Sequence, residues 1–152
     1  MSYFRSIFLG AVFCASPSWS EPDRLSLLIG SAHIDASRDY QQINPGVFAT
    51  WEDRAGGLDY SLGIYRNSYD GVSVAGTAAL PLFEVASAEV SLLAGAALYP
   101  GEGRRFRFHI GDVAAFVGLQ IRRDPVFLQV IPGGGSDPAA IISFGITLPI
   151  GR

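Results

Sequence analysis

Few side chains in this 152-residue sequence are suited to acid–base chemistry, and its two histidines are the first candidates. His33 lies at the end of an apolar segment, and His109 follows a cluster of arginines. An imidazole can give or take a proton near neutral pH, so it is a natural general acid or base. A histidine at the end of a strand is also an ordinary polar residue. The residue types alone leave both interpretations of His33 open.

Other catalytic and cofactor signals are absent from the sequence. It has no Cys and His residues at metal-ligand spacing, no phosphate-binding glycine loop and no Gly-x-Ser-x-Gly elbow. We therefore expect no cofactor and no metal. The net charge is −3, whereas a nucleic-acid-binding domain normally has a concentrated basic face. The nearest candidate is Arg104, Arg105 and Arg107, which would either meet anionic lipid headgroups or form a solvated turn.

Residues 1–20 have the pattern of a cleaved signal peptide. Arg5 supplies the positive start, residues 6–15 are apolar, and the segment ends in Ser18-Trp19-Ser20, with cleavage expected after Ser20. The apolar stretch has about half of the roughly 20 residues that a membrane-spanning helix needs. Bulky Phe13 directly before Cys14 argues against lipid attachment at that cysteine.

Removal of this peptide leaves 152 − 20 = 132 residues without cysteine, which suits a single domain over residues 21–152. No disulfide can stabilise this domain, so sheet closure, packing or a membrane must do so. We expect an exported protein, located in the outer membrane of a Gram-negative cell.

The remaining chain is a series of short apolar segments separated by turn residues, which predicts an all-β protein. The separators are rich in Gly, Pro, Asn and Asp, which supply the positive or fixed φ that turns require. We predict eight antiparallel strands in an up-and-down β-barrel, over residues 25–34, 46–52, 58–67, 72–80, 88–99, 112–122, 126–131 and 139–150.

One face of these strands is large and apolar, because alternate side chains of a strand point to opposite faces. The third segment illustrates the pattern, with Leu58, Tyr60, Leu62 and Ile64 alternating with Asp59, Ser61 and Gly63. The second face is mostly Gly, Ala, Ser and Thr. A soluble lipocalin-like barrel needs a charged outer face, whereas a membrane barrel turns its apolar face to lipid and small polar residues to a narrow lumen. We predict a transmembrane barrel. The alternative is a soluble periplasmic barrel that binds an apolar ligand, favoured by Arg152 where outer-membrane barrels commonly end on an aromatic residue.

This orientation would bury several polar side chains in the lumen. Unpaired polar groups inside a protein are destabilising, so they would need each other or the arginines as partners. The residues concerned are Asp59, Glu89, Asp112, Gln120 and Gln129.

Four segments, in this order and at this spacing, resemble the lipid A palmitoyltransferase (PagP) family. They are residues 40–46 (YQQINPG), 65–70 (YRNSYD), 75–76 (AG) and 125–133 (PVFLQVIPG), and the similarity covers about residues 30–150. The resemblance implies an eight-stranded outer-membrane barrel that moves a palmitoyl chain from a phospholipid to lipid A. Phospholipid and lipid A are then the expected partners, nucleic acid is not, and the expected state is a monomer.

The resemblance also implies a site at the extracellular rim, and its positions fall on His33, Asn67 and Ser68. The histidine would take a proton from an incoming hydroxyl, and the serine would polarise the substrate carbonyl. Asn67 stands where the family has an acidic residue. An amide can orient an imidazole by a hydrogen bond, but it cannot stabilise imidazolium by charge. His109 matches no residue of that site, and we interpret it as structural.

Two further features depart from the family. Its mature protein begins with an amphipathic helix, whereas only residues 21–24 precede the first predicted strand here. The loop between His33 and Pro45 is also short. Two membrane hypotheses therefore stand side by side: an outer-membrane acyltransferase, and a barrel of the same shape with a structural or lipid-binding role and no enzymatic activity.

Overall fold

The computed structural model describes residues 21–133 and 137–150, so the predicted signal peptide lies outside the described residues. Nearly all of the described chain is in strands or short connections. The elements are β1 Arg24–Ile34, β2 Ile43–Arg54, β3 Leu58–Arg66, β4 Val72–Val85, β5 Ala88–Leu98, the 3₁₀ turn η1 Gly103–Arg105, β6 His109–Ile110, β7 Val113–Arg123, β8 Val126–Pro132 and β9 Ala140–Pro149.

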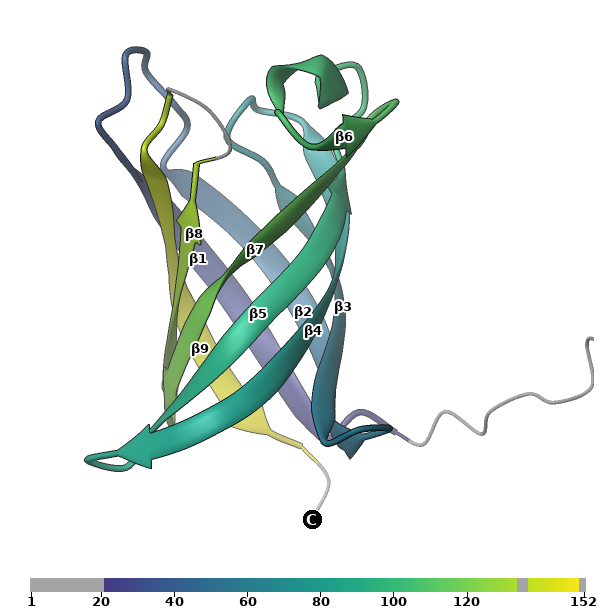
Figure 1. Cartoon of the computed structure of the whole chain (residues 1–152), viewed down its shortest axis with the longest axis vertical. Coiled ribbons are helices and arrows are strands. Elements are labelled where there is room, and N and C mark those ends of the chain that lie inside the picture. Colours follow the sequence, from purple (N-terminus) through teal and green to yellow (C-terminus); the bar gives the residue numbers. More distant parts are fainter. Residues whose placement is uncertain (1–20, 134–136, 151–152) are drawn as a thin grey trace, which may run out of the picture.

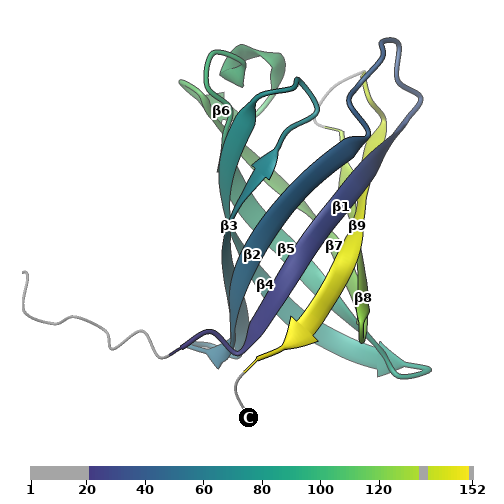
Figure 2. The same cartoon turned by 180° about the vertical axis from the view of Figure 1, so that it is seen from behind.

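Eight of these strands form one closed antiparallel barrel. Strands that follow one another pair side by side, β1 also pairs with β9, and β5 pairs with β7, which closes the sheet (Figure 1 and Figure 2). The two-residue β6 pairs only with β7 at one end of the barrel. The predicted all-β, eight-stranded antiparallel barrel is therefore confirmed. In the two described stretches, no helix is long and apolar enough to cross a membrane.

Six of the eight predicted strands agree with the structure to within one residue at each end, and two differ. β2 begins at Ile43 rather than at Gly46. β4 runs to Val85, so the prediction that this strand ends before Pro81 is wrong. The register between β4 and β5 shifts between Pro81 and Phe83, and a bulge is a position where a strand tolerates proline, which has no N–H to give.

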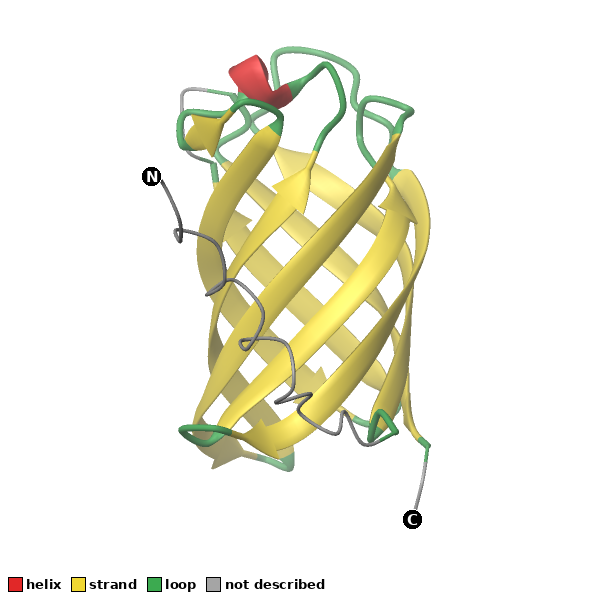
Figure 3. Cartoon of the chain, turned by 90° about the vertical axis from the view of Figure 1, so that its right-hand side faces the viewer, coloured by secondary structure: helices red, strands yellow, loops and turns green. Residues whose placement is uncertain are grey.

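The two ends of the barrel differ in their connections. At the terminal end, where the described chain begins and finishes, short turns join β2 to β3, β4 to β5 and β7 to β8 (Figure 1). At the opposite end, which we call the loop end, lie residues 35–42, the β3–β4 turn over residues 67–71, residues 99–112 with η1 and β6, and the described residues 133 and 137–139 between β8 and β9 (Figure 3). His33 and Ser68 are both at the loop end.

The outer and inner faces of the barrel have the predicted character. Large apolar side chains point outward, and Leu62 and Leu92 are 54% and 47% exposed. Small and polar side chains point inward. Those that are buried include Ser31, Thr50, Ser73, Ala75, Ser91, Ala97 and Thr147.

Three phenylalanines of the lumen each stand directly opposite a glycine of the neighbouring strand: Phe48 and Gly63, Phe116 and Gly95, Phe127 and Gly145. The glycines leave space for the rings. A Cβ atom at Gly63 would lie 2.2 Å from the ring of Phe48, and one at Gly95 would lie 2.7 Å from that of Phe116. The rings therefore lie against the barrel wall and leave room along the axis.

Ion pairs occupy the terminal end of the lumen. The carboxylates around Arg122 are those of Glu52 (2.9 Å), Glu89 (3.0 Å) and Asp59 (3.5 Å). Arg24 binds Glu52 at 3.0 Å and Asp124 at 2.7 Å. Asp59 and Glu89 thus have the arginine partner that the sequence predicted for them.

Of the other polar residues predicted to face the lumen, two agree with the prediction and one does not. The Gln129 amide donates to the Gln120 carbonyl oxygen at 2.9 Å, as predicted. Asp112 is instead exposed at the loop end, where its carboxylate accepts a hydrogen bond from the Gly101 amide at 2.9 Å. The prediction that Asp112 faces the lumen is wrong because β7 begins at Val113, after a turn that contains Gly111 with a φ of 58°.

Candidate functional site

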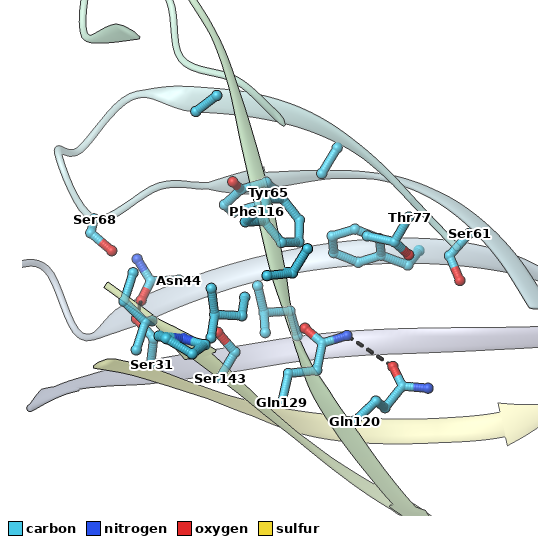
Figure 4. Close-up of a pocket in the computed structure, with 18 of the residues that line it drawn as sticks. Ser31, Asn44, Ser61, Tyr65, Ser68, Thr77, Phe116, Gln120, Gln129 and Ser143 are labelled. Atoms are coloured by element: carbon cyan, nitrogen blue, oxygen red, sulfur yellow. Dashed lines mark hydrogen bonds between the residues drawn. The ribbon is translucent and has the colours of Figure 1, made fainter. Parts of the chain in front are cut away.

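A cavity of about 340 Å³ runs through the lumen. This volume is near the lower end of the range for sites that hold a small ligand. Figure 4 shows part of its wall, where polar side chains such as Ser31, Asn44 and Ser68 gather at one end. Apolar lining comes from several strands, and includes Leu28, Phe48, Ala75, Phe116, Ile131 and Ile141.

His33 lines this cavity near the end of β1, where it stands opposite Ile141 of β9. Its ring stacks on Tyr40, with ring centroids 4.4 Å apart and 12° between the planes. The Nδ1 atom is buried, and no described residue gives it a hydrogen bond. One ring nitrogen of His33 therefore has no hydrogen-bond partner among the described residues.

Ser68 lies in the β3–β4 turn and lines the same cavity. Its backbone carbonyl accepts a hydrogen bond from the Gln41 amide at 3.1 Å, which ties this turn to the loop that carries Tyr40. Tyr40 and Tyr69 are also in edge contact, with centroids 5.8 Å apart. The loop end thus brings His33 and Ser68 to one cavity, joined through the Tyr40 loop.

Asn67 has a different place. It is 2% exposed, and its carboxamide oxygen accepts hydrogen bonds from the amides of Tyr69 (2.9 Å) and Gly71 (3.0 Å). Its amide group donates to the Ser73 hydroxyl at 2.8 Å. An asparagine that bonds the backbone two residues on is a common turn device. Asn67 therefore shapes the turn that presents Ser68, and these contacts occupy both ends of its amide.

A carboxylate that the sequence interpretation missed lies at this end of the lumen. Asp137, in the β8–β9 connection, lines the cavity together with His33. It accepts hydrogen bonds from the Ser37 amide at 2.7 Å and the Ser37 hydroxyl at 2.6 Å, and Arg38 lies 3.5 Å away. These bonds hold the pKa of Asp137 below its ordinary value. Residues 132–138 look like a plain Gly- and Pro-rich turn in the sequence, so no signal distinguished this residue.

Aromatic rings form the mouth of the cavity. The Tyr65 hydroxyl donates to the Tyr99 hydroxyl at 2.8 Å, and Tyr99 packs on Phe106 with centroids 4.3 Å apart. Tyr69 lies edge-on to both Tyr99 and Phe106. Burial raises the pKa of Tyr69 to about 12, so its hydroxyl stays protonated at neutral pH.

The predicted arginine cluster lies at the same end of the barrel: Arg105 and Arg107 line the cavity, whereas His109 is not among its lining residues. Arg105 stands over the Tyr69 ring at 5.1 Å and pairs with Glu102. Arg107 stands over Phe108 at 5.5 Å. His109 is exposed in β6, with its Nδ1 3.1 Å from the Gly111 carbonyl oxygen. Its contacts are local to the turn.

The wall of the barrel is not paired along its whole height. The ladder between β7 and β8 covers residues 119–123 and 126–130. Nearer the loop end, residues 113–118 of β7 pair with β5, and none of them pairs with the described residues of β8. The β7–β8 seam is therefore held by fewer backbone hydrogen bonds beside the site than at the terminal end.

The site combines an unpaired imidazole nitrogen, a serine hydroxyl and a partly apolar cavity. Such a set can move a proton to or from a hydroxyl and hold an apolar chain beside it. Within the described stretches, no group of three or more His, Cys, Asp or Glu side chains could hold a metal ion. A scan against protein-family models finds no family that matches the chain, and a search of curated proteins finds no match.

Proposed function

We propose that this protein is an outer-membrane β-barrel. The support is the distribution of its side chains, because large apolar groups cover the outside while ion pairs and hydrogen-bonded amides lie in the lumen. A soluble barrel needs the reverse arrangement, since an extensive exposed apolar face favours association. Strands such as β3, with 9 residues, and β7, with 11, match the roughly 9 to 11 residues of a tilted crossing.

The lumen of this barrel takes up one acyl chain of a membrane lipid, and the loop end transfers it to lipid A. The observation that carries this proposal is that His33 and Ser68 line one cavity whose walls are partly apolar. The sparsely paired part of the β7–β8 seam offers a lateral route from the bilayer to this cavity. The resemblance to the lipid A palmitoyltransferases supplies the donor and the acceptor.

The transfer needs no cofactor. A hydroxyl oxygen of lipid A attacks the carbonyl carbon of the phospholipid ester, a new ester bond forms, and the bond from that carbon to the glycerol oxygen breaks. His33 takes the proton from the attacking hydroxyl and returns it to the departing glycerol oxygen. The hydroxyl of Ser68 donates to the carbonyl oxygen and stabilises the charge that develops there.

A second candidate is a barrel that binds lipid without transferring its chain. Asn67 favours this alternative, because both ends of its amide bond the turn and its position holds no carboxylate. Tyr40 favours it as well, since its ring covers one face of the His33 imidazole.

Expression in a Gram-negative host that lacks its own lipid A palmitoyltransferase separates the two candidates. The transferase predicts lipid A heavier by one acyl chain in mass spectra, with loss of this species in His33→Ala and Ser68→Ala. His109→Ala is the matched control, because that histidine lies outside the cavity, and it keeps the product. A folded barrel in the outer membrane without acylated product contradicts transfer and leaves the binding protein. Recovery in the soluble periplasm contradicts both.

A further inference from the structure

Asn44 has a buried amide in the wall of the lumen, and this amide has no part in the acyl transfer proposed above. It lies near the start of β2, is 2% exposed and lines the cavity. Buried polar side-chain atoms nearly always have hydrogen-bond partners, so each exception calls for an explanation. The Nδ2 atom of Asn44 is such an exception, since no described residue bonds it.

The orientation of this amide is set by its neighbour on β1. The Ser31 hydroxyl donates to the Asn44 carboxamide oxygen at 2.6 Å, and Ser31 is itself buried. This bond uses the oxygen side of the amide, so the NH₂ side is the part without a partner among the described residues. In Figure 4 the amide nitrogen of Asn44 and the hydroxyl of Ser68 point toward one another. The second buried side-chain atom without a partner, Nδ1 of His33, is two residues from Ser31 on the same strand.

We propose that Asn44 donates a hydrogen bond to the carbonyl oxygen of an acyl ester bound in the lumen. This inference rests on the proposed function and adds the residue that positions the reacting carbonyl. The ligand class follows from the donors and the walls: a carbonyl accepts from both the Asn44 amide and the Ser68 hydroxyl, and its apolar chain lies along the lining. The choice of an ester over a free carboxylate follows from the proposed function, because Arg105 and Arg107 line this cavity as well as Asp137.

The direct probe is a fatty-acid methyl ester with a carbon-13 carbonyl, added to the folded protein in an ester-free detergent. A hydrogen bond to the carbonyl lowers its infrared stretching frequency. We expect a lowered band in the wild type. In Asn44→Leu, where Ser68 remains as a donor, the band should move back toward the free-ester frequency. The same variant should bind the ester about three- to tenfold more weakly, as removal of one neutral hydrogen bond predicts.

Three comparisons keep the test specific. An ether analogue of the same chain has no carbonyl, so its affinity should be equal in wild type and Asn44→Leu. The double variant S31A/N44L removes both partners of the buried pair and should retain barrel stability while its band shows the same upward shift. Asn44→Asp keeps the acceptor for Ser31, lacks the NH₂ donor, and should also show this upward shift.

The outcomes distinguish this inference from the proposed function. An ester that binds the wild type with an unshifted carbonyl band, or with equal affinity to Asn44→Leu, overturns the role of Asn44 and leaves lumen binding intact. Failure of both ester and ether to bind the folded wild-type barrel overturns the lipid-binding function, and the role of Asn44 with it. If ester and ether weaken equally in Asn44→Leu, Asn44 merely shapes the cavity, and the inference is wrong.

Discussion

The imidazole of His33 lies parallel to the phenol ring of Tyr40, 4.4 Å away between centroids. His33 belongs to the barrel wall, whereas Tyr40 belongs to the loop between β1 and β2. The candidate base is therefore covered on one face by a loop whose backbone is tied to the Ser68 turn at Gln41. Access to His33 should depend on this loop.

Removal of the Tyr40 ring is expected to uncover His33. Diethyl pyrocarbonate modifies accessible histidines, and in a His109→Ala background His33 is the only histidine left in the chain. We predict faster modification of His33 in Tyr40→Ala than in the parent, and a parent-like rate in Tyr40→Phe, which preserves the stacked ring. Equal rates in all three proteins would contradict the covering role of Tyr40.

Asn67 is expected to act through the turn. Asn67→Ala leaves the amides of Tyr69 and Gly71 and the hydroxyl of Ser73 without this partner, and we predict a loss of about 1–3 kcal/mol in the free energy of unfolding. Asn67→Asp keeps both contacts to the turn amides and should lose less. Denaturant titration of the folded barrel measures both values.

The same pair of variants tests whether position 67 takes part in chemistry. Because contacts within the turn occupy the side chain, Asn67→Asp should leave any acyl transfer rate unchanged. A clear rise in that rate would show that a carboxylate at this position reaches His33. Position 67 would then do more than shape the turn.

The glycines opposite the lumen phenylalanines should resist substitution. A methyl group at Gly63 meets the Phe48 ring at 2.2 Å, so Gly63→Ala is predicted to destabilise the barrel by about 1–3 kcal/mol. Gly76 is the matched control, because the nearest atom to a Cβ there is the Ser61 carbonyl oxygen at 3.9 Å. Equal stability of Gly63→Ala and Gly76→Ala would mean that the Phe48 ring does not depend on the space above Gly63.

The contact between Asp137 and Ser37 predicts a pH dependence of the loop end. The folded pKa of Asp137 is depressed, so its contribution to stability is complete above the ordinary carboxyl pKa of about 3.9 and is lost as the pH falls through the lower folded value. Carbon-13 NMR of the carboxyl group should give a midpoint below the ordinary one. Ser37→Ala removes the hydroxyl donor and should raise that midpoint. No change in Ser37→Ala would exclude this hydrogen bond as the cause.

Much of the barrel could be predicted from the sequence, because alternation is a local property that each strand repeats. Leu62 and Ser61 have opposite character, and the structure places them on opposite faces. The partner of Asp59 was also predictable in kind, since a carboxylate buried in a lumen needs a cation. The pattern could not identify Arg122 as that cation, because strand order and register around a closed barrel are long-range properties.

The candidate site was harder to predict, because it is built by loops. Asp137 is separated from Ser37 by 100 residues, and nothing in the local sequence links them. Asn67 directly follows a strand and Asp112 directly precedes one. The alternation of side chains along a strand does not hold at such positions, because turn geometry determines their contacts. In the sequence, Asn44 resembles a turn residue because it stands beside a proline, whereas in the structure its amide is buried in the barrel wall.

The central claim is that the large apolar face of this barrel contacts lipid. The chain after residue 20 has no cysteine, so single cysteines can be introduced and labelled with a fluorophore. In vesicles with brominated acyl chains, labels at Leu62→Cys and Leu92→Cys, which are outward and exposed, should be quenched, whereas one at Thr77→Cys in the lumen should not. Absence of quenching at both outward positions, in protein shown to be folded, would contradict the account.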